Sequence, residues 1–145
     1  MFFTKKFFKK SEGERIVQSI MAAEARTSGE IRVHIQKKIK GELMEEAIKV
    51  FKHLKMDETE LRNSVLIFIV PSKKSFCIIG DEGIDNIVPE NFWEDIKEDL
   101  RMHFQSNKIT EGLCKNIERI GEKLKSHFPI EEDDKNELPD TISYA

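Results

Sequence analysis

The sequence predicts an α/β protein, a three-layer α/β/α sandwich around a small sheet that mixes parallel and antiparallel strands. Apolar residues recur at helical spacing near the N-terminus, alternate over the next stretch as in a strand, and then return to helical spacing. Residues 64–70 (SVLIFIV) are an unbroken apolar run of strand length, which is typical of a strand buried on both faces. Helices should therefore cover both sides of the sheet.

A helix, a strand and a second helix are expected in the first part of the chain. Ser11 and Glu14 have the spacing of a capping box, and the residues after them repeat apolar side chains at helical spacing up to Ser28. Every second side chain of residues 31–36 is apolar, so this stretch should form a strand with one buried and one solvent-facing side. Residues 42–54 carry a single apolar stripe and should form an amphipathic helix.

Two strands and two helices should follow. The apolar run at 64–70 is separated by only four residues from the next strand, residues 75–79, and so short a link favours an antiparallel hairpin. The helix between the first two strands instead predicts that they are parallel, with a right-handed crossover. Apolar residues at helical spacing then predict one helix over residues 90–104, beginning near Pro89, and another over residues 109–128.

The chain divides into three segments: a basic and aromatic segment at residues 1–10, an α/β domain at 11–128 and an acidic tail at 129–145. The length of 145 residues suits one domain with one core. The phenylalanines of the first segment either dock on the domain, which we favour, or make a weak contact with a membrane surface. The tail is either a disordered, solubilising end or folds back at residues 137–140, near the lysines of residues 5–10.

The composition excludes several classes of protein. The net charge of −3 argues against a nucleic-acid partner, and no apolar stretch is long enough to cross a membrane. The first ten residues lack the features of a signal peptide, so we expect a cytoplasmic protein, and a monomer. Cys77 and Cys114 have no paired-cysteine spacing, and we interpret both as reduced thiols in the core. The four histidines are scattered and should be surface or interface residues.

The predicted topology brings polar stretches to one edge of the sheet. The two parallel strands begin at that edge and the antiparallel strand ends there, so residues 28–30, 62–63 and 80–83 should lie close together. The helix expected near Pro89 would add its free N–H groups and the positive end of its dipole. One patch would then combine several carboxylates, an arginine, an asparagine and a helix N-terminus.

Three of these carboxylates, those of Asp81, Glu82 and Asp85, occupy a single turn after the third predicted strand. Carboxylate and carbonyl oxygens are the ligands that a hard cation such as Ca²⁺ or Mg²⁺ takes. The alternative is a solvent-exposed turn whose acids stabilise the start of the following helix. The spacing of the three residues leaves both interpretations open.

With these motifs in order, the chain resembles the TPM-domain family, also called TPM-type phosphatases, which includes proteins of the thylakoid lumen and of photosystem II repair and many bacterial proteins. The resemblance runs from residue 11 to residue 128. In the second motif many members have glycine where this chain has Ser64. The motifs that carry the resemblance are SGEIRVHI (28–35), RNSVLIFIV (62–70), IIGDEGI (78–84) and EGLCKNIERIGEKL (111–124).

The resemblance implies an α/β/α sandwich, binding of a divalent metal (Ca²⁺ or Mg²⁺) and phosphatase activity. Metal-binding character falls on Asp81, Glu82 and Asp85 and, less directly, on Glu30, Arg62 and Asn63.

We therefore predict a metal-assisted phosphomonoester hydrolase in which water attacks directly. Arg62 would clamp the phosphoryl oxygens, and Arg62 and Asn63 are the candidate catalytic residues. The substrate would be a phosphate-containing small molecule or a phosphoprotein. The alternative is a non-catalytic module that binds a metal and then a protein or membrane partner.

Overall fold

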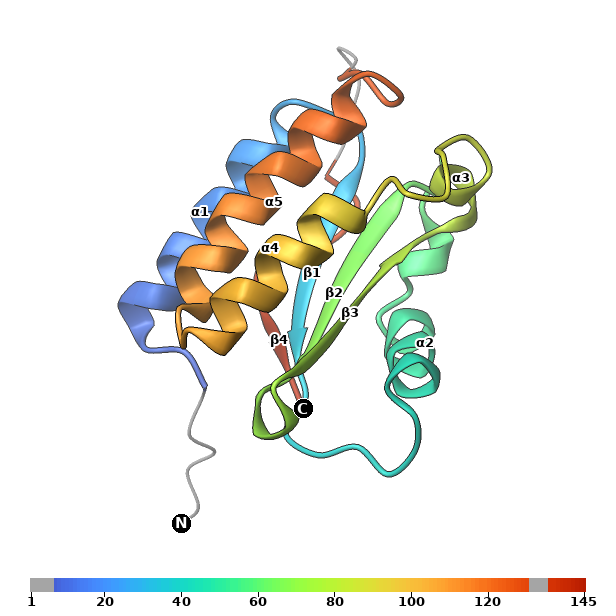
Figure 1. Cartoon of the computed structure of the whole chain (residues 1–145). Coiled ribbons are helices and arrows are strands. Elements are labelled where there is room, and N and C mark those ends of the chain that lie inside the picture. Colours follow the sequence, from blue (N-terminus) through green and yellow to red (C-terminus); the bar gives the residue numbers. More distant parts are fainter. Residues whose placement is uncertain (1–6, 131–135) are drawn as a thin grey trace.

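The protein consists of three layers, with the sheet between helices on both of its faces (Figure 1). The structure is a computed structural model that describes residues 7–130 and 136–145. The described α-helices are α1 (Lys10–Glu24), α2 (Leu43–His53), α3 (Glu82–Asp85), α4 (Glu94–Gln105) and α5 (Ile109–Lys125). The strands are β1 (Glu30–Ile35), β2 (Ser64–Val70), β3 (Ser75–Gly80) and β4 (Ser143–Tyr144).

The four strands lie side by side in the order β3-β2-β1-β4. β1 and β2 are parallel, with Glu30 opposite Ser64 and Ile35 opposite Ile69. β2 and β3 are antiparallel and are joined by the short turn Pro71–Lys73. The predicted α/β/α sandwich, its parallel pair and its hairpin are therefore confirmed.

Burial of β2 on both faces divides the apolar interior into two cores. The larger core, formed with α1, α4 and α5, contains Val65, Ile67 and Ile69. The smaller core, formed with α2, contains Leu66, Phe68 and Val70. On the first face α1 and α5 approach closely, since a Cβ on Gly121 would lie 2.8 Å from the Cα of Ala23. Only glycine fits at this crossing without moving one of the two helices.

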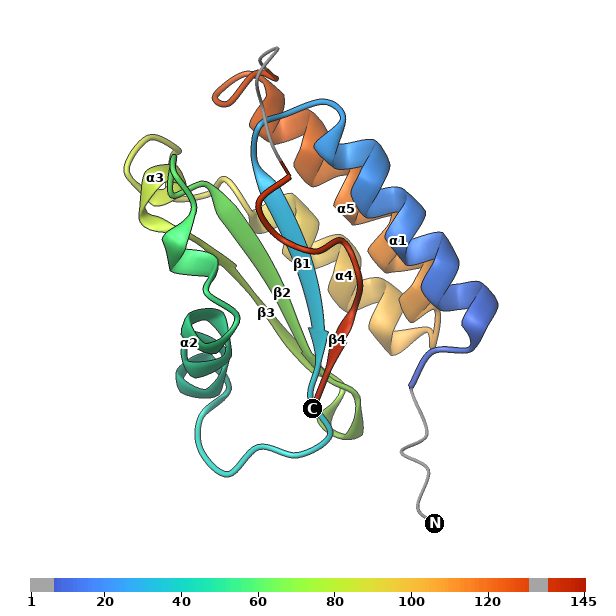
Figure 2. The ribbon, with the colours of Figure 1, turned by 180° about the vertical axis from the view of Figure 1, so that it is seen from behind.

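The polar side of β1 is covered by the C-terminal segment, so our expectation of a solvent-facing side and of a surface position for His34 was wrong. All six residues of β1 are buried. The guanidinium of Arg32 donates to the backbone oxygen of Thr141 (3.4 Å), and Nδ1 of His34 lies 2.6 Å from the hydroxyl of Ser143. The segment runs along β1 and ends as β4, parallel to it (Figure 2).

Two element boundaries also differ from expectation. The backbone N–H of Lys9 donates to the carboxylate of Glu12 (2.9 Å), so the capping interaction of α1 lies two residues before the predicted one, and Ser11 is inside the helix. The helix expected to begin near Pro89 begins at Glu94, because residues 90–93 form turns instead.

Both chain ends contact the domain where the structure describes them. Phe8 is buried in the larger core, as the favoured docking interpretation predicts, whereas Phe7 is exposed, and Phe2 and Phe3 lie outside the described residues. In the tail, Leu138 is buried in the smaller core, and the N–H of Glu60 donates to the carboxylate of Glu137 (3.2 Å). The tail therefore folds back at 137–140. The described partners of Glu137 and Leu138 are Glu60 and Glu30, while Lys5 and Lys6 lie outside the described residues.

Leu138→Ala should destabilise the fold if this docking is a structural part of the domain. Leu138 is only 8% exposed, so its truncation should lower the free energy of unfolding by about 2 kcal/mol, measured by urea titration. Ile130→Ala is the matched control, since this side chain is 50% exposed and its loss should change stability by less than about 0.5 kcal/mol. Equal, small effects of both substitutions would contradict the docking.

Candidate functional site

An ion pair between Arg62 and Asp81 forms the centre of the candidate site, at the edge where β2 begins and β3 ends. The guanidinium donates from Nε to Oδ2 (2.7 Å) and from Nη2 to Oδ1 (2.9 Å) of Asp81, and from Nη1 to Glu82 (3.0 Å). Asp81 is 6% exposed, whereas the side chain of Arg62 is 37% exposed. The hydrogen bond to Asp81 raises the pKa of Arg62 above its usual value, so this arginine stays charged.

The backbone around this pair explains why the turn contains a glycine at position 83. The N–H of Gly83 donates to the backbone oxygen of Arg62 (2.9 Å), and a Cβ at residue 83 would lie 2.3 Å from the oxygen of Leu61. Arg62 itself has a left-handed backbone, with φ of 50°. The carboxylate of Asp81 caps α3 by accepting from the N–H of Glu82 (2.8 Å). The two loops are therefore locked together by backbone and side-chain bonds.

Asp85 completes the acidic turn. It lies one helical turn after Asp81, and its Oδ1 is 3.4 Å from where a Cβ on Gly80 would stand. Partial burial, followed by repulsion from Asp81, raises the pKa of Asp85. The structure thus brings Arg62, Asp81, Glu82 and Asp85 to one place, as predicted, although the helix that begins there is the single turn α3.

Asn63 and Glu30 lie at the same edge but make separate contacts. The amide of Asn63 is buried and donates to the hydroxyl of Ser28 (3.3 Å). The carboxylate of Glu30 is also buried, and its Oε1 accepts the N–H of Leu138 (2.6 Å) beneath the C-terminal segment. Neither side chain takes part in the Arg62–Asp81 pair.

A second group of carboxylates surrounds Glu30, and its other members were not among the predicted site residues. The carboxylate of Glu24 accepts the N–H of Ile31 (2.9 Å). Burial, with a hydrogen bond to Asp140, raises the pKa of Glu24 to about 9, and burial raises the pKa of Glu30 to about 7. Glu24 follows Ile20 by four residues, so its place on the apolar stripe of α1 was the signal that could have revealed it.

Both groups of carboxylates offer oxygen atoms, which are the ligands that a hard cation such as Ca²⁺ or Mg²⁺ takes. Within residues 7–130 and 136–145, however, no set of three or more histidine, cysteine, aspartate or glutamate side chains is arranged closely enough to hold a metal ion. At the acidic turn the positive charge beside Asp81 is supplied by Arg62.

This arrangement of sheet, turn and helices agrees with the sequence comparisons. The TPM domain profile matches residues 2–123. The chain belongs to the TPM-domain family. A comparison with curated protein sequences gives no match.

Solved structures extend this likeness. The chain is similar to the BA42 protein of the psychrophilic bacterium Bizionia argentinensis, with 39% identity, full coverage of both chains and a TM-score of 0.93. It also resembles the N-terminal domain of a P. gingivalis protein, with 17% identity, a TM-score of 0.67 and coverage of 83% and 78% of the two chains. The N-terminal domain of cg2496 from Corynebacterium glutamicum has 10% identity, a TM-score of 0.63 and coverage of 96% and 80%. With the last two the likeness is one of fold alone.

None of the described helices combines the length and the apolar composition needed to cross a membrane.

The raised pKa values of Glu24 and Glu30 predict a pH-dependent stability. Because the folded state holds protons that the unfolded chain releases near pH 4.5, stability should fall as the pH rises to about 7 through Glu30, and further to about 9 through Glu24. Urea titration across this range should give a flatter profile below pH 7 for Glu30→Gln. The exposed Glu14→Gln is the control and should follow the wild type. Parallel profiles for all three proteins would contradict the assignment.

Proposed function

We propose that this TPM domain is a cation-dependent phosphomonoester hydrolase that acts at the turn formed by Arg62, Asp81, Glu82 and Asp85. The observation that carries the proposal is the partly exposed guanidinium of Arg62, which the buried carboxylate of Asp81 holds in one orientation. A guanidinium presents its N–H donors as a planar fork, and this geometry matches the oxygens of a phosphoryl group as well as those of a carboxylate. The substrate class is a phosphorylated small molecule or a phosphoprotein.

Arg62 can bind a phosphoryl group without leaving Asp81. Its guanidinium has five N–H donors, and among the described residues three of them are engaged, in hydrogen bonds to Asp81 and Glu82. The remaining two donors are available to phosphoryl oxygens. Asp81 thus acts as a positioning residue that orients the guanidinium.

The carboxylates of the acidic turn are ligands of the type that a divalent cation binds. Partial burial and then repulsion from Asp81 raise the pKa of Asp85, and a cation beside Asp85 would offset both effects on its charged form. Glu82 and Asp85 are exposed and would be its two carboxylate ligands, with water completing the coordination. When bound, the cation would polarise the phosphate and lower the pKa of an attacking water.

A second function is favoured by one feature of the same turn. Both oxygens of Asp81 are engaged, by Arg62 and by the N–H of Glu82, so this buried carboxylate is poorly placed to take a proton from water. The same turn would then bind a cation and a phosphorylated or membrane partner without hydrolysis.

Hydrolysis of an aryl phosphate, with and without a chelator, tests the enzyme. Arg62→Lys should lower kcat/KM about tenfold or more, because lysine keeps the charge but loses the fork. Arg26→Lys is the matched control: Arg26 also pairs with an exposed glutamate, at 3.1 Å, and its replacement should leave activity unchanged. Activity that is indifferent both to the chelator and to Arg62→Lys would refute the mechanism, and saturable cation binding without hydrolysis would support the second function.

Cation binding at this turn predicts a distinct pattern among the acids. Glu82→Gln and Asp85→Asn should each weaken Ca²⁺ or Mg²⁺ binding several-fold in calorimetry, since each removes one charged oxygen ligand. Glu90→Gln, an exposed acid beyond α3, is the control and should bind as the wild type does. Unchanged affinity in both turn variants would move the cation away from this turn.

A further inference from the structure

The strand β3 lies at one edge of the sheet and has an open side. Among the described strands, in the order β3-β2-β1-β4, its one neighbour is β2. The N–H of Asp81 donates to Ser64 of β2 (2.9 Å), and in an antiparallel pair the backbone groups alternate in direction. Cys77 and Ile79 therefore bond to β2, whereas the N–H and C=O groups of Phe76 and Ile78 point away from the sheet.

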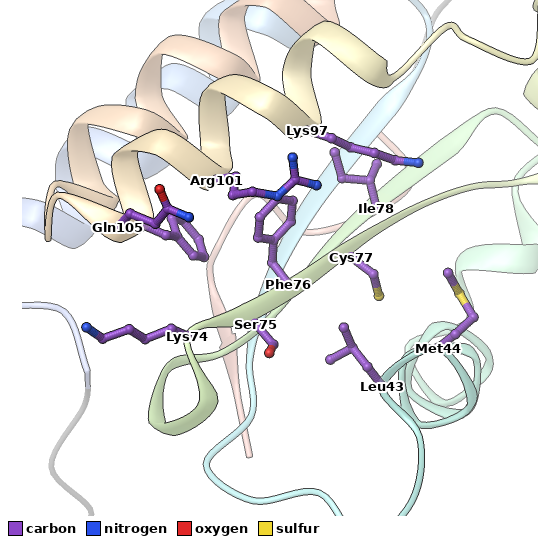
Figure 3. A pocket seen from close by; sticks show the side chains of 11 residues that line it. Leu43, Met44, Lys74, Ser75, Phe76, Cys77, Ile78, Lys97, Arg101 and Gln105 are labelled. Carbon is purple, nitrogen blue, oxygen red and sulfur yellow. The ribbon is translucent and has the colours of Figure 1, made fainter.

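A groove of about 510 Å³ runs along this open side (Figure 3). Leu43 and Met44 of α2 form one wall, and Lys97, Arg101 and Gln105 of α4 form the other. The floor of the groove is well packed, because the ring of Phe76 contacts the ring of Phe104 with their centroids 5.0 Å apart. Its volume is within the range of about 300–1,000 Å³ that is common for ligand sites.

The two walls differ in chemistry. The α2 wall is apolar, and Met44 is 47% exposed although it is a large apolar side chain. The α4 wall is basic, and Lys74 adds a third cation just before β3 begins, while none of the described residues that line the groove is a carboxylate. Lys97 and Arg101 each pair with a glutamate three residues earlier on α4, both well exposed to solvent. Exposed pairs of this kind are weak, so the two cations can accept another carboxylate.

We propose that this groove binds an extended, acidic peptide segment of a partner protein, which adds to β3 as a fifth strand. Backbone bonds to Phe76 and Ile78 would hold the strand, as in other cases of β-strand addition. Side chains of a strand alternate between its two faces, so acidic residues would face Lys97 and Arg101 and the apolar residues between them would face Met44. The site is separate from the Arg62–Asp81 turn and does not depend on the proposed hydrolysis.

Titration of the ¹⁵N-labelled protein with a capped hexapeptide of alternating valine and glutamate tests the proposal. Hydrogen exchange should slow at the amides of Phe76 and Ile78, which gain partners. The amides of Cys77 and Ile79 already bond to β2 and serve as an internal reference that should change little. The same peptide with lysine in place of glutamate should bind at least tenfold more weakly.

Charge reversal separates the groove from general electrostatic attraction. The double variant Lys97→Glu and Arg101→Glu should weaken binding of the valine–glutamate peptide about tenfold. The single variant Lys97→Glu has Lys49→Glu as its matched control, because Lys49 on α2 pairs with Glu46 at the same 3.6 Å as Lys97 with Glu94, yet does not line the groove. This control should bind the peptide as the wild type does.

Three results would overturn the proposal. One is equal affinity for the glutamate and lysine peptides, and another is unchanged exchange at Phe76 and Ile78 in the saturated complex. The third is that a second copy of this chain occupies the groove. Sedimentation would then detect a dimer, and the Arg101→Glu substitution would dissociate it.

Discussion

The strand β2 is buried along its whole length, and much of the architecture follows from the need to cover both of its faces. Burial of apolar surface stabilises the fold by about 25 cal/mol per Å², and this stabilisation is lost wherever a face of the strand stays in contact with water. Helices α1, α4 and α5 cover one face and α2 covers the other. The crossover through α2 makes β1 parallel to β2, and the short hairpin makes β3 antiparallel. These two directions bring the polar ends of three strands to one edge.

The candidate site is therefore a consequence of how the chain enters and leaves the central hairpin. The chain must turn sharply before Ser64 and after Gly80, and each turn leaves backbone groups that need partners. Gly83 supplies one of them by donating to the oxygen of Arg62, and Asp81 donates to Ser64. The fork between Arg62 and Asp81 joins the same two turns through side chains. Structural locking thus engages three of the five donors of Arg62, and the phosphate recognition that we propose would use the other two.

The sequence predicted the elements that carry a clear apolar pattern, and missed those held by polar contacts. The strands at 31–36, 64–70 and 75–79 and the grouping of Arg62 with Asp81 followed from apolar pattern and direction alone. β4 has two residues and carries no pattern. Its position depends on Arg32 and His34, whose bonds to Thr141 and Ser143 span more than a hundred residues. Pro89 suggested a helix start, but the chain continues in turns to Glu94.

The tail also reaches the loop that carries Arg62, and this links the two groups of carboxylates. Glu137 accepts the N–H of Glu60, two residues before Arg62, and Leu138 is held by Glu30, which is paired with Ser64 across β1 and β2. Loss of the tail would therefore free the loop on one side while Asp81 still held it on the other. The tail and Asp81 both hold this loop, so the position of the Arg62 guanidinium depends on both of them. This matters because a small displacement of a binding group can impair its function. The C-terminal segment is thus a support of the candidate site as well as a cover for β1.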